Sequence, residues 1–214
     1  MVSNKLTQDT QSTQGTDKIL INEYFTSIQG EGFYSGVPAF FIRFSGCDIG
    51  CKWCDTRDAI SMKNSKLTDI TEILQRVIEN RLELVVVTGG EPALHPLKFL
   101  FHELKKARKT IHLETSGAYP LDALPDWMTL SPKSIFPPLK ENYPMADELK
   151  IVISEPKDFD FAMEQAGYAD KNCRLFLQPE WAKKDQVMPA IINFIKENPR
   201  WRLSLQIHKY LGLK

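Results

Sequence analysis

Three cysteines within eight residues are the first feature of this sequence that could support chemistry. Cys47, Cys51 and Cys54 stand in the stretch GCDIGCKWCDT. Two cysteines can close a disulfide and four can enclose a zinc ion, so a group of three leaves one position of a metal centre open. Three thiolates can hold three irons of a 4Fe–4S cluster and leave the fourth iron for a ligand from outside the protein. The spacing therefore favours a cluster that binds another molecule.

A structural zinc site is the alternative interpretation of the same cysteines. Such a site is normally closed by a fourth cysteine or histidine. Cys173 and the four histidines are candidates, but none has a zinc-like spacing to the other three cysteines. Cys173 lies in the apolar run CRLFL, where we expect a small buried hydrophobic residue. The cysteines alone favour the cluster and leave zinc open.

Several unusual loops follow strand-like segments elsewhere in the chain. The segments and loops are FIRFSG before the cysteines, LELVVVT before GGEP, TIHLE before TSG, WMTL before SPK, RLFLQ before PE, and RLSLQ before IHK. In parallel α/β folds the carboxyl ends of the strands share one rim, where ligands bind. We therefore expect these loops to converge on one site.

The elements that would position these loops alternate between strand-like and helix-like patterns from Ile19 onward. The stretch LTDITEILQRVIEN predicts an amphipathic helix capped by Thr68 or Asp69. About four good helices for about seven strands are too few for a complete eight-fold barrel. The predicted fold class is α/β, a partial, open (β/α) barrel with a mostly parallel sheet. Residues 18–214 are expected to form one domain, and the polar residues 1–17 a disordered tail.

The composition limits the possible partners. Lys plus Arg and Asp plus Glu are both 27, so the net charge is zero and no overall basic field favours nucleic acid. The N-terminus lacks a signal pattern, and no stretch approaches the roughly 20 apolar residues of a membrane span. We therefore expect a cytoplasmic protein with a small-molecule partner, in which clustered cysteines bind metal more often than they form disulfides.

The motifs resemble those of a known superfamily. CDIGCKWC, with Trp53 before the last cysteine, is similar to the signature of radical S-adenosylmethionine (SAM) enzymes, and GGEP is similar to their second motif. SIQGEGFYSGVPAFFIRFSGC, WCDT, TGGEP, LETSG, SPK, LQP and LSLQIHKYLG resemble the 7-carboxy-7-deazaguanine synthase family from Asn22 to the C-terminus. Some members space the first two cysteines more widely, whereas this chain keeps the ordinary gap.

The resemblance implies an activity. The family converts 6-carboxy-5,6,7,8-tetrahydropterin into 7-carboxy-7-deazaguanine, a step toward queuosine, by radical ring contraction with loss of ammonia. It uses a 4Fe–4S cluster, SAM and Mg²⁺, and is usually a homodimer that receives electrons from a donor such as flavodoxin or ferredoxin. The radical chemistry belongs to the cofactor, so the resemblance implies no catalytic side chain, and the protein aims the radical.

The resemblance also assigns binding roles to residues. Cys47, Cys51 and Cys54 would hold the cluster, and Thr56 would share Mg²⁺ with the pterin carboxylate. Substrate contacts would come from Ile28, Gln29, Gly30, Arg43, Thr88, His208 and the terminal Lys214. SAM contacts would come from Gly90, Glu91, Glu114, Ser131, Lys133 and Gln178. Arg43 suits a carboxylate by its bidentate fork, whereas glycines in a turn or a threonine at a strand end are often only structural.

Two other functions share parts of this pattern. An activase for a glycyl-radical enzyme has the same cysteine spacing but acts on a protein, and would not need the QGEG loop, the threonine of WCDT or the HK-containing tail. A non-catalytic, zinc-binding interaction module is the second alternative. Identification of the metal and a test with the pterin would separate the three.

Overall fold

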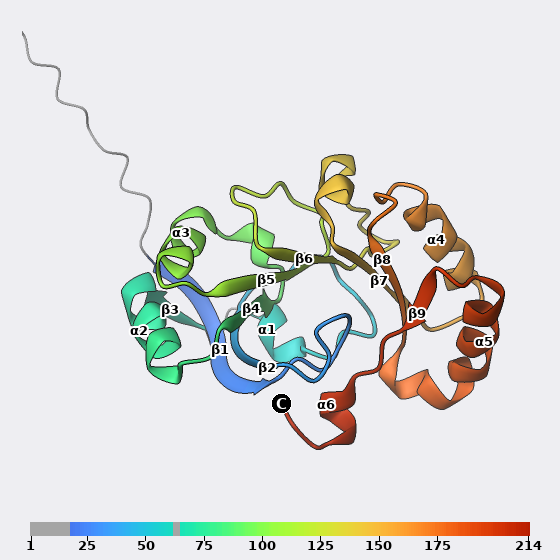
Figure 1. Ribbon diagram of the computed structural model, residues 1–214, viewed down its shortest axis with the longest axis horizontal. Coiled ribbons are helices and arrows are strands. Elements are labelled where there is room, and N and C mark those ends of the chain that lie inside the picture. Colours follow the sequence, from blue (N-terminus) through green and yellow to red (C-terminus); the bar gives the residue numbers. More distant parts are fainter. Residues whose placement is uncertain (1–17, 62–64) are drawn as a thin grey trace, which may run out of the picture.

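A single nine-stranded sheet forms the centre of the molecule, in the order β3-β1-β2-β4-β5-β6-β7-β8-β9. The computed structural model describes residues 18–61 and 65–214. The strands are β1 (Lys18–Ile28), β2 (Pro38–Phe44), β3 (Lys66–Asp69), β4 (Leu84–Gly89), β5 (Thr110–Thr115), β6 (Trp127–Leu130), β7 (Glu148–Ile153), β8 (Arg174–Pro179) and β9 (Trp201–Leu203). From β2 to β9 all neighbours are parallel, whereas β1 runs antiparallel to β2 and β3. The sheet curves but stays open (Figure 1).

The helices are α1 (Arg57–Ile60), α2 (Ile70–Asn80), α3 (Lys98–Lys106), α4 (Lys157–Ala166), α5 (Lys184–Glu197) and α6 (Ile207–Tyr210), with short 3₁₀ helices at Pro92–Leu94, Lys140–Met145 and Trp181–Lys183. Helices α2 to α5 cover the outer, convex side of this sheet, whereas α1 follows the cysteine loop and α6 lies near the C-terminus (Figure 1). The Asp69 side chain caps α2 by accepting from the Thr71 N–H at 2.9 Å, as the sequence predicts.

Two hydrophobic clusters fill the space between sheet and helices. The first joins β1, β2, β4 and β5 to α2 and α3 and includes Phe44 and Phe101. The second joins β6, β7 and β8 to α4 and α5 and includes Leu149 and Ile191. Full burial of such a side chain stabilises the fold by roughly 1.5–3 kcal/mol. The two clusters thus hold both halves of the sheet against their helices.

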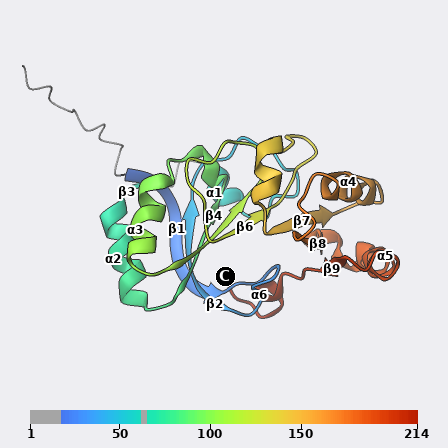
Figure 2. The ribbon, with the colours of Figure 1, turned by 45° about the horizontal axis from the view of Figure 1, so that its top comes forward.

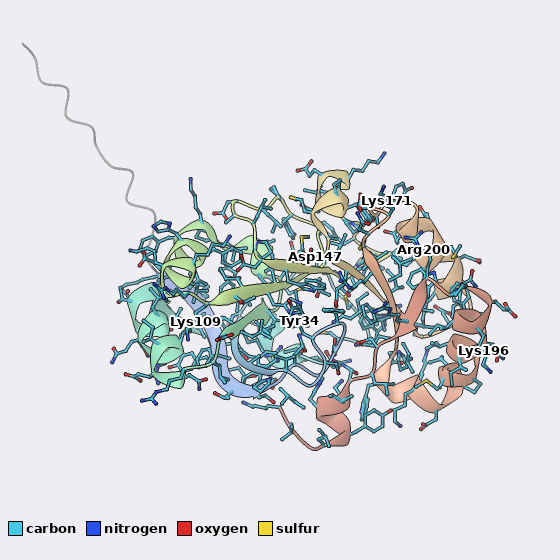
Figure 3. All side chains as sticks on the ribbon, viewed as in Figure 1. Tyr34, Lys109, Asp147, Lys171, Lys196 and Arg200 are labelled. Atoms are coloured by element: carbon cyan, nitrogen blue, oxygen red, sulfur yellow. The ribbon has the colours of Figure 1, made fainter. Side chains whose placement is uncertain are left out.

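The inner, concave side of the sheet carries buried polar side chains. On β5 the apolar Ile111 and Leu113 belong to the first cluster, on the outer side of the sheet, and the polar His112 and Glu114 alternate with them. On β7, Glu148 and Lys150 alternate in the same way with apolar residues. Because successive side chains of a strand point to opposite faces, these polar groups share the inside of the curve. Tyr34 also lies there, against the rings of His112 and Trp127 (Figure 3).

The segment after β9 returns across the open side of the sheet to β1. The Ile207 N–H donates to the Gly30 carbonyl at 3.0 Å, and the Ser27 hydroxyl donates to the Lys214 carbonyl at 2.8 Å. In Figures 1 and 2 the C-terminus lies beside β2, although β2 is far from it in the sequence. The tail therefore bridges the gap between the two ends of the open barrel.

The predicted fold class is confirmed, with differences at several elements. The strand predicted over RLSLQ is shorter, since β9 ends at Leu203. Helix α5 begins at Lys184 and continues through Pro189. The predicted tail, residues 1–17, lies outside the described residues, and the single domain over 18–214 stays a prediction. In the described part of the chain, no helix is long and apolar enough to cross a bilayer.

Candidate active site

A cavity of about 240 Å³ opens at the carboxyl ends of the strands. Every residue to which the sequence analysis assigns a site role lines this cavity: Ile28, Gln29, Gly30, Arg43, Cys47, Cys51, Cys54, Thr56, Thr88, Gly90, Glu91, Glu114, Ser131, Lys133, Gln178, His208 and Lys214. The predicted convergence of the loops is therefore present in the structure. Which group each residue binds is not settled by this position and stays a prediction.

The cysteine loop follows β2 and packs directly on the GGEP loop. The Glu91 N–H donates to the Gly46 carbonyl at 2.9 Å, and the Gly90 N–H donates to the Phe44 carbonyl at 3.0 Å. A Cβ atom on Gly90 would collide with the Gly46 carbonyl. Glycine is required here because two backbones approach closely.

The three clustered cysteines are free, half-buried and directed into the same cavity. Burial raises the pKa of the Cys47 and Cys51 thiols, so a positively charged metal centre is needed to favour their thiolates. Cys173 is buried in the second hydrophobic cluster, and burial raises its pKa to about 12. It is therefore the small buried residue that the sequence predicts.

These cysteines suit a cluster better than a single ion. Within residues 18–61 and 65–214, no three His, Cys, Asp or Glu side chains converge as the ligands of one metal ion do. A closed zinc site requires such convergence. The thiolates of a 4Fe–4S cluster each bind a different iron, so they can stand farther apart around a cavity. The donor set, three thiols without a fourth, fits the cluster.

The loop after β6 supplies a half-buried cation beside the cysteines. The Lys133 ammonium donates to the carbonyl and hydroxyl of Ser131, both at 2.6 Å, and lies 5.3 Å from the centre of the Trp53 ring. Burial lowers the pKa of Lys133. On β8, the Gln178 side-chain oxygen accepts from the Ser204 hydroxyl at 2.9 Å.

Glu91 is engaged by the protein itself. Its carboxylate accepts from the Ala93 N–H at 3.0 Å, the Thr115 hydroxyl at 2.6 Å, and both the N–H and hydroxyl of Ser116. Four donors fill the usual capacity of a carboxylate. Glu91 therefore ties the GGEP loop to the loop after β5, and its predicted contact with SAM stays a prediction.

Glu114 is the acceptor at the centre of the opposite wall. Its carboxylate accepts from Gln29 Nε2 at 2.8 Å and from the Thr88 hydroxyl at 3.2 Å. Burial alone would raise the pKa of Glu114, but the Lys150 ammonium, His112, the hydrogen bond from Gln29 and Arg43 together outweigh it and hold the pKa at about 2. The group is therefore an ionised carboxylate inside the cavity at neutral pH.

Lys150 and Glu31 line the cavity although the sequence analysis does not name them. The Lys150 ammonium pairs with Glu31 and lies 4.0 Å from Glu114 Oε1. Burial opposes its charge, yet the surrounding carboxylates, Glu114 foremost, raise its pKa above the ordinary value. A lysine inside the apolar strand ELKIVIS was the available signal, because a buried charge requires partners.

Arg43 and Thr56 stand together on the cavity wall. Arg43 Nε lies 3.1 Å from Glu23 Oε1, and a terminal nitrogen of its guanidinium donates to the Thr56 hydroxyl at 3.4 Å. The terminal Lys214 pairs with the same Glu23 and also lines the cavity. Two cations and a hydroxyl thus surround one region of the wall.

The open parallel sheet with a three-cysteine loop at its rim defines the class of this protein as a radical SAM enzyme. The family model described as "Radical SAM superfamily" matches residues 41–155, more than half of the chain. An enzyme of this class uses a 4Fe–4S cluster and SAM, a small-molecule substrate and an electron donor. The predicted resemblance to radical SAM enzymes and the predicted enzymatic class are confirmed.

Similar proteins narrow the class to one family. The 7-carboxy-7-deazaguanine synthase of Flavobacterium psychrophilum is 44% identical over 91% of each chain. That of Escherichia coli K12 is 33% identical over 90% of this chain and 98% of its own. The crystal structure of QueE from Escherichia coli matches with a TM-score of 0.77 and 32% identity, covering 90% of this chain and 95% of that one. This chain belongs to the 7-carboxy-7-deazaguanine synthase family.

Proposed function

We propose that this protein converts 6-carboxy-5,6,7,8-tetrahydropterin into 7-carboxy-7-deazaguanine, a step of queuosine biosynthesis. The observation that carries the proposal is the single cavity that joins the three-cysteine loop to a wall of ionised and hydrogen-bonding groups. Family membership supports the same reaction, a ring contraction with loss of ammonia.

The cysteines and the GGEP loop form the cofactor side of the cavity. When bound there, the cluster and SAM supply the carbon radical that removes one hydrogen atom from the substrate. Cys47, Cys51 and Cys54 hold the cluster, and Ser131, Lys133 and Gln178 orient SAM from the neighbouring rim loops. The backbone at Gly90 sets the distance between this side and the cysteine loop.

The opposite wall orients the flat heterocycle. The resemblance implies a SAM contact for Glu114, but its hydrogen bonds with Gln29 and Thr88, which have implied substrate roles, favour a substrate role. Kept ionised beside Lys150, Glu114 accepts from ring N–H groups, while Gln29, Thr88 and the backbone of Ile28 and Gly30 fix the ring edge. A planar substrate held between fixed acceptors presents one hydrogen to the cofactor side, and such orientation lowers the barrier. His208, packed on Gly30, closes this wall.

The substrate carboxylate belongs beside Arg43 and Lys214. The guanidinium of Arg43 offers a bidentate contact, and the Thr56 hydroxyl within its reach is an oxygen ligand for Mg²⁺. Mg²⁺ usually keeps several waters and takes few protein ligands, so one threonine and the substrate carboxylate are a sufficient anchor.

The electron donor would approach from the outer side of the cysteine loop. Cys51, Trp53 and Cys54 line both the cavity and a second hollow of about 740 Å³. Lys52 and Arg57 are exposed beside this hollow and have no ion pair among the described residues. They suit an acidic carrier such as flavodoxin or ferredoxin.

A homodimer in the cytoplasm is the form expected from the resemblance and the composition, and it completes the proposal. Light scattering in solution tests the number of subunits.

One anaerobic incubation tests the function. Protein reconstituted with iron and sulfide, then mixed with SAM, the tetrahydropterin and dithionite, is expected to form 7-carboxy-7-deazaguanine, identified by mass spectrometry. Absence of this product from protein that carries a cluster and cleaves SAM would overturn the proposal in favour of an activase. A colourless protein with stoichiometric zinc would indicate the interaction module.

A further inference from the structure

The cysteine loop has little regular structure to hold it in place. Between Gly46 and Thr56 its backbone bonds include Gly46 to Ala59 at 2.8 Å and Cys54 to Cys51 at 3.3 Å, and no helix or strand is formed. Side chains therefore matter for its position. Asp48 accepts from the Tyr119 hydroxyl at the start of the loop, and Asp55 is bound at its end.

Asp55 is bound by the C-terminal tail. Its Oδ2 accepts from Gln206 Nε2 at 2.8 Å and from the Lys209 ammonium at 2.6 Å. These partners are 151 and 154 residues away in the sequence. Asp55 stands between Cys54, a cluster ligand, and Thr56, the proposed Mg²⁺ ligand, so displacement of its side chain would move both neighbours.

Gln206 connects this contact to the pterin wall. The same Nε2 also donates to Glu31 Oε1 at 2.6 Å, and its Oε1 accepts from Lys209 at 2.9 Å. Gln206 is buried, and both hydrogens of its amide and its oxygen have partners. Glu31 in turn pairs with Lys150, beside Glu114. One amide thus joins the cysteine loop to the groups that face the ring of the substrate.

We propose that Gln206 is a positioning residue: it joins Asp55 of the cysteine loop to Glu31 of the pterin wall and sets the distance between the radical source and the substrate. This rests on the proposed function and extends it to motif residues for which the resemblance implies no role. The Asp55 side chain is 47% exposed, and an exposed ion pair with Lys209 alone would contribute little. The buried amide carries the link, because it cannot exchange its partners for water without loss.

A reciprocal exchange of groups tests this link. Gln206→Glu replaces a double donor with a third carboxylate facing Asp55 and Glu31, and Asp55→Asn removes the charged acceptor. Combined, the two changes restore one hydrogen bond with the donor and acceptor reversed. Each single change is expected to raise the amount of 5′-deoxyadenosine formed per molecule of product about fivefold, because the hydrogen is no longer in line. The double variant should recover part of this loss, because the hydrogen bond between positions 55 and 206 is restored while the donor to Glu31 is not.

Lys184→Met is the matched control. Lys184 and Lys209 lie at 5.2 and 5.1 Å from the same Trp181 ring, but Lys184 pairs with Asp185 and does not line the cavity. This change should leave the product ratio unchanged. An equal effect of Lys184→Met, or single variants with the wild-type ratio, would overturn the proposal.

Hydrogen exchange on the iron-free chain gives a readout that does not require activity. Amides of residues 46–60 should exchange faster in both single variants and at the wild-type rate in the double variant. Failure of the double variant to restore either readout contradicts a direct link. If the wild type forms no 7-carboxy-7-deazaguanine, the proposed function fails, while the exchange pattern still decides whether the link exists.

Discussion

At the scale of single residues, the cysteines differ by their surroundings. Cys51 lines the cavity, whereas Cys173 is packed among apolar side chains of the second cluster. Cys51→Ala is expected to abolish the iron–sulfur absorption and SAM cleavage, because one iron loses its ligand. Cys173→Ala should keep both and lose only packing stability. Iron content and absorption after anaerobic reconstitution check this, and loss of the cluster in Cys173→Ala with its retention in Cys51→Ala would reverse the ligand assignment.

Thr56 allows a test of the proposed Mg²⁺ site. Its hydroxyl is within reach of Arg43 and donates to Asp55 Oδ1 at 3.3 Å, so it already lies among groups that orient it. Thr56→Ala should bind the cluster and SAM normally but turn over about tenfold to a hundredfold more slowly, by analogy with changes around metal ligands. Titration of Mg²⁺ into chelator-treated enzyme measures the response, which should be small in the variant. Thr71→Ala, on the exposed face of α2, is the control and should respond to Mg²⁺ as the wild type does. A wild type whose turnover does not depend on Mg²⁺ would contradict the proposed site.

At the scale of elements, the tail after β9 completes the pterin wall. Its last residues are tied to β1 through Lys214, which pairs with Glu23 and accepts from Ser27, and to α6 through the Leu213 N–H, which donates to the His208 carbonyl at 2.8 Å. Deletion of residues 210–214 removes these contacts but keeps Gln206 and Lys209. The KM for the pterin should rise about tenfold, the effect of one lost charged contact, with the KM for SAM unchanged. If the steady-state kinetics are unchanged by the deletion, residues 210–214 do not contribute to substrate binding.

The sequence predicts these elements unevenly, for physical reasons. β4, LVVVTG, is a continuous apolar run because a parallel strand is buried on both faces, so it is easily recognised. α2 is equally clear from its spacing and its Asp69 cap. In contrast, α1 and α6 have four residues each, too few for a periodic pattern. β3, KLTD, is also short, and its pairing with β1 is set by the fold rather than by its composition.

The residues of the site also differ in how well the sequence predicts them. The cysteines, GGEP and SPK are local motifs, and the resemblance places them correctly around one cavity. Glu31, Asp55 and Gln206 lie in three further motifs, but no motif shows that they contact one another, since their contacts join segments more than a hundred residues apart. Periodicity describes neighbours in the sequence, so only the curved sheet and the returning tail reveal such contacts.

At the scale of the whole molecule, the barrel interior carries polar groups on β5 and β7 beside an apolar cluster on β2 and β4. Glu114 and Lys150 face the cavity, and His112 and Glu148 lie one strand repeat further toward the amino ends. Each charge needs a buried partner, as Lys150 has in Glu31 and Glu114. The interior that fixes the substrate is therefore also a source of pH-dependent stability.

His112 determines part of that dependence. It is buried, its Nε2 lies 2.6 Å from the Thr129 hydroxyl, and its Nδ1 has no partner among the described residues. Burial, aided by Lys150 and opposed by Glu114, lowers the pKa of His112 from 6.5 to about 4. The unfolded chain therefore binds a proton between these values that the folded protein does not, so stability falls as the pH falls from 6.5 toward 4.

The expected loss from this histidine is about 2 kcal/mol between pH 7 and pH 5. His112→Gln keeps a polar group near Thr129 but cannot titrate, so its free energy of unfolding should fall by about 2 kcal/mol less over the same interval. Denaturant unfolding at the two pH values measures both proteins. His102→Gln, on exposed α3, should behave as the wild type. The pKa values of Glu114 and Asp55 are held at about 2, below their ordinary values of 4.5 and 3.8. Their contributions to stability are therefore full above about pH 5 and are lost as the pH falls from there toward 2. Equal pH dependence in the wild type and His112→Gln would mean that the pKa of His112 is the same in the folded and the unfolded chain, and would contradict the lowered value.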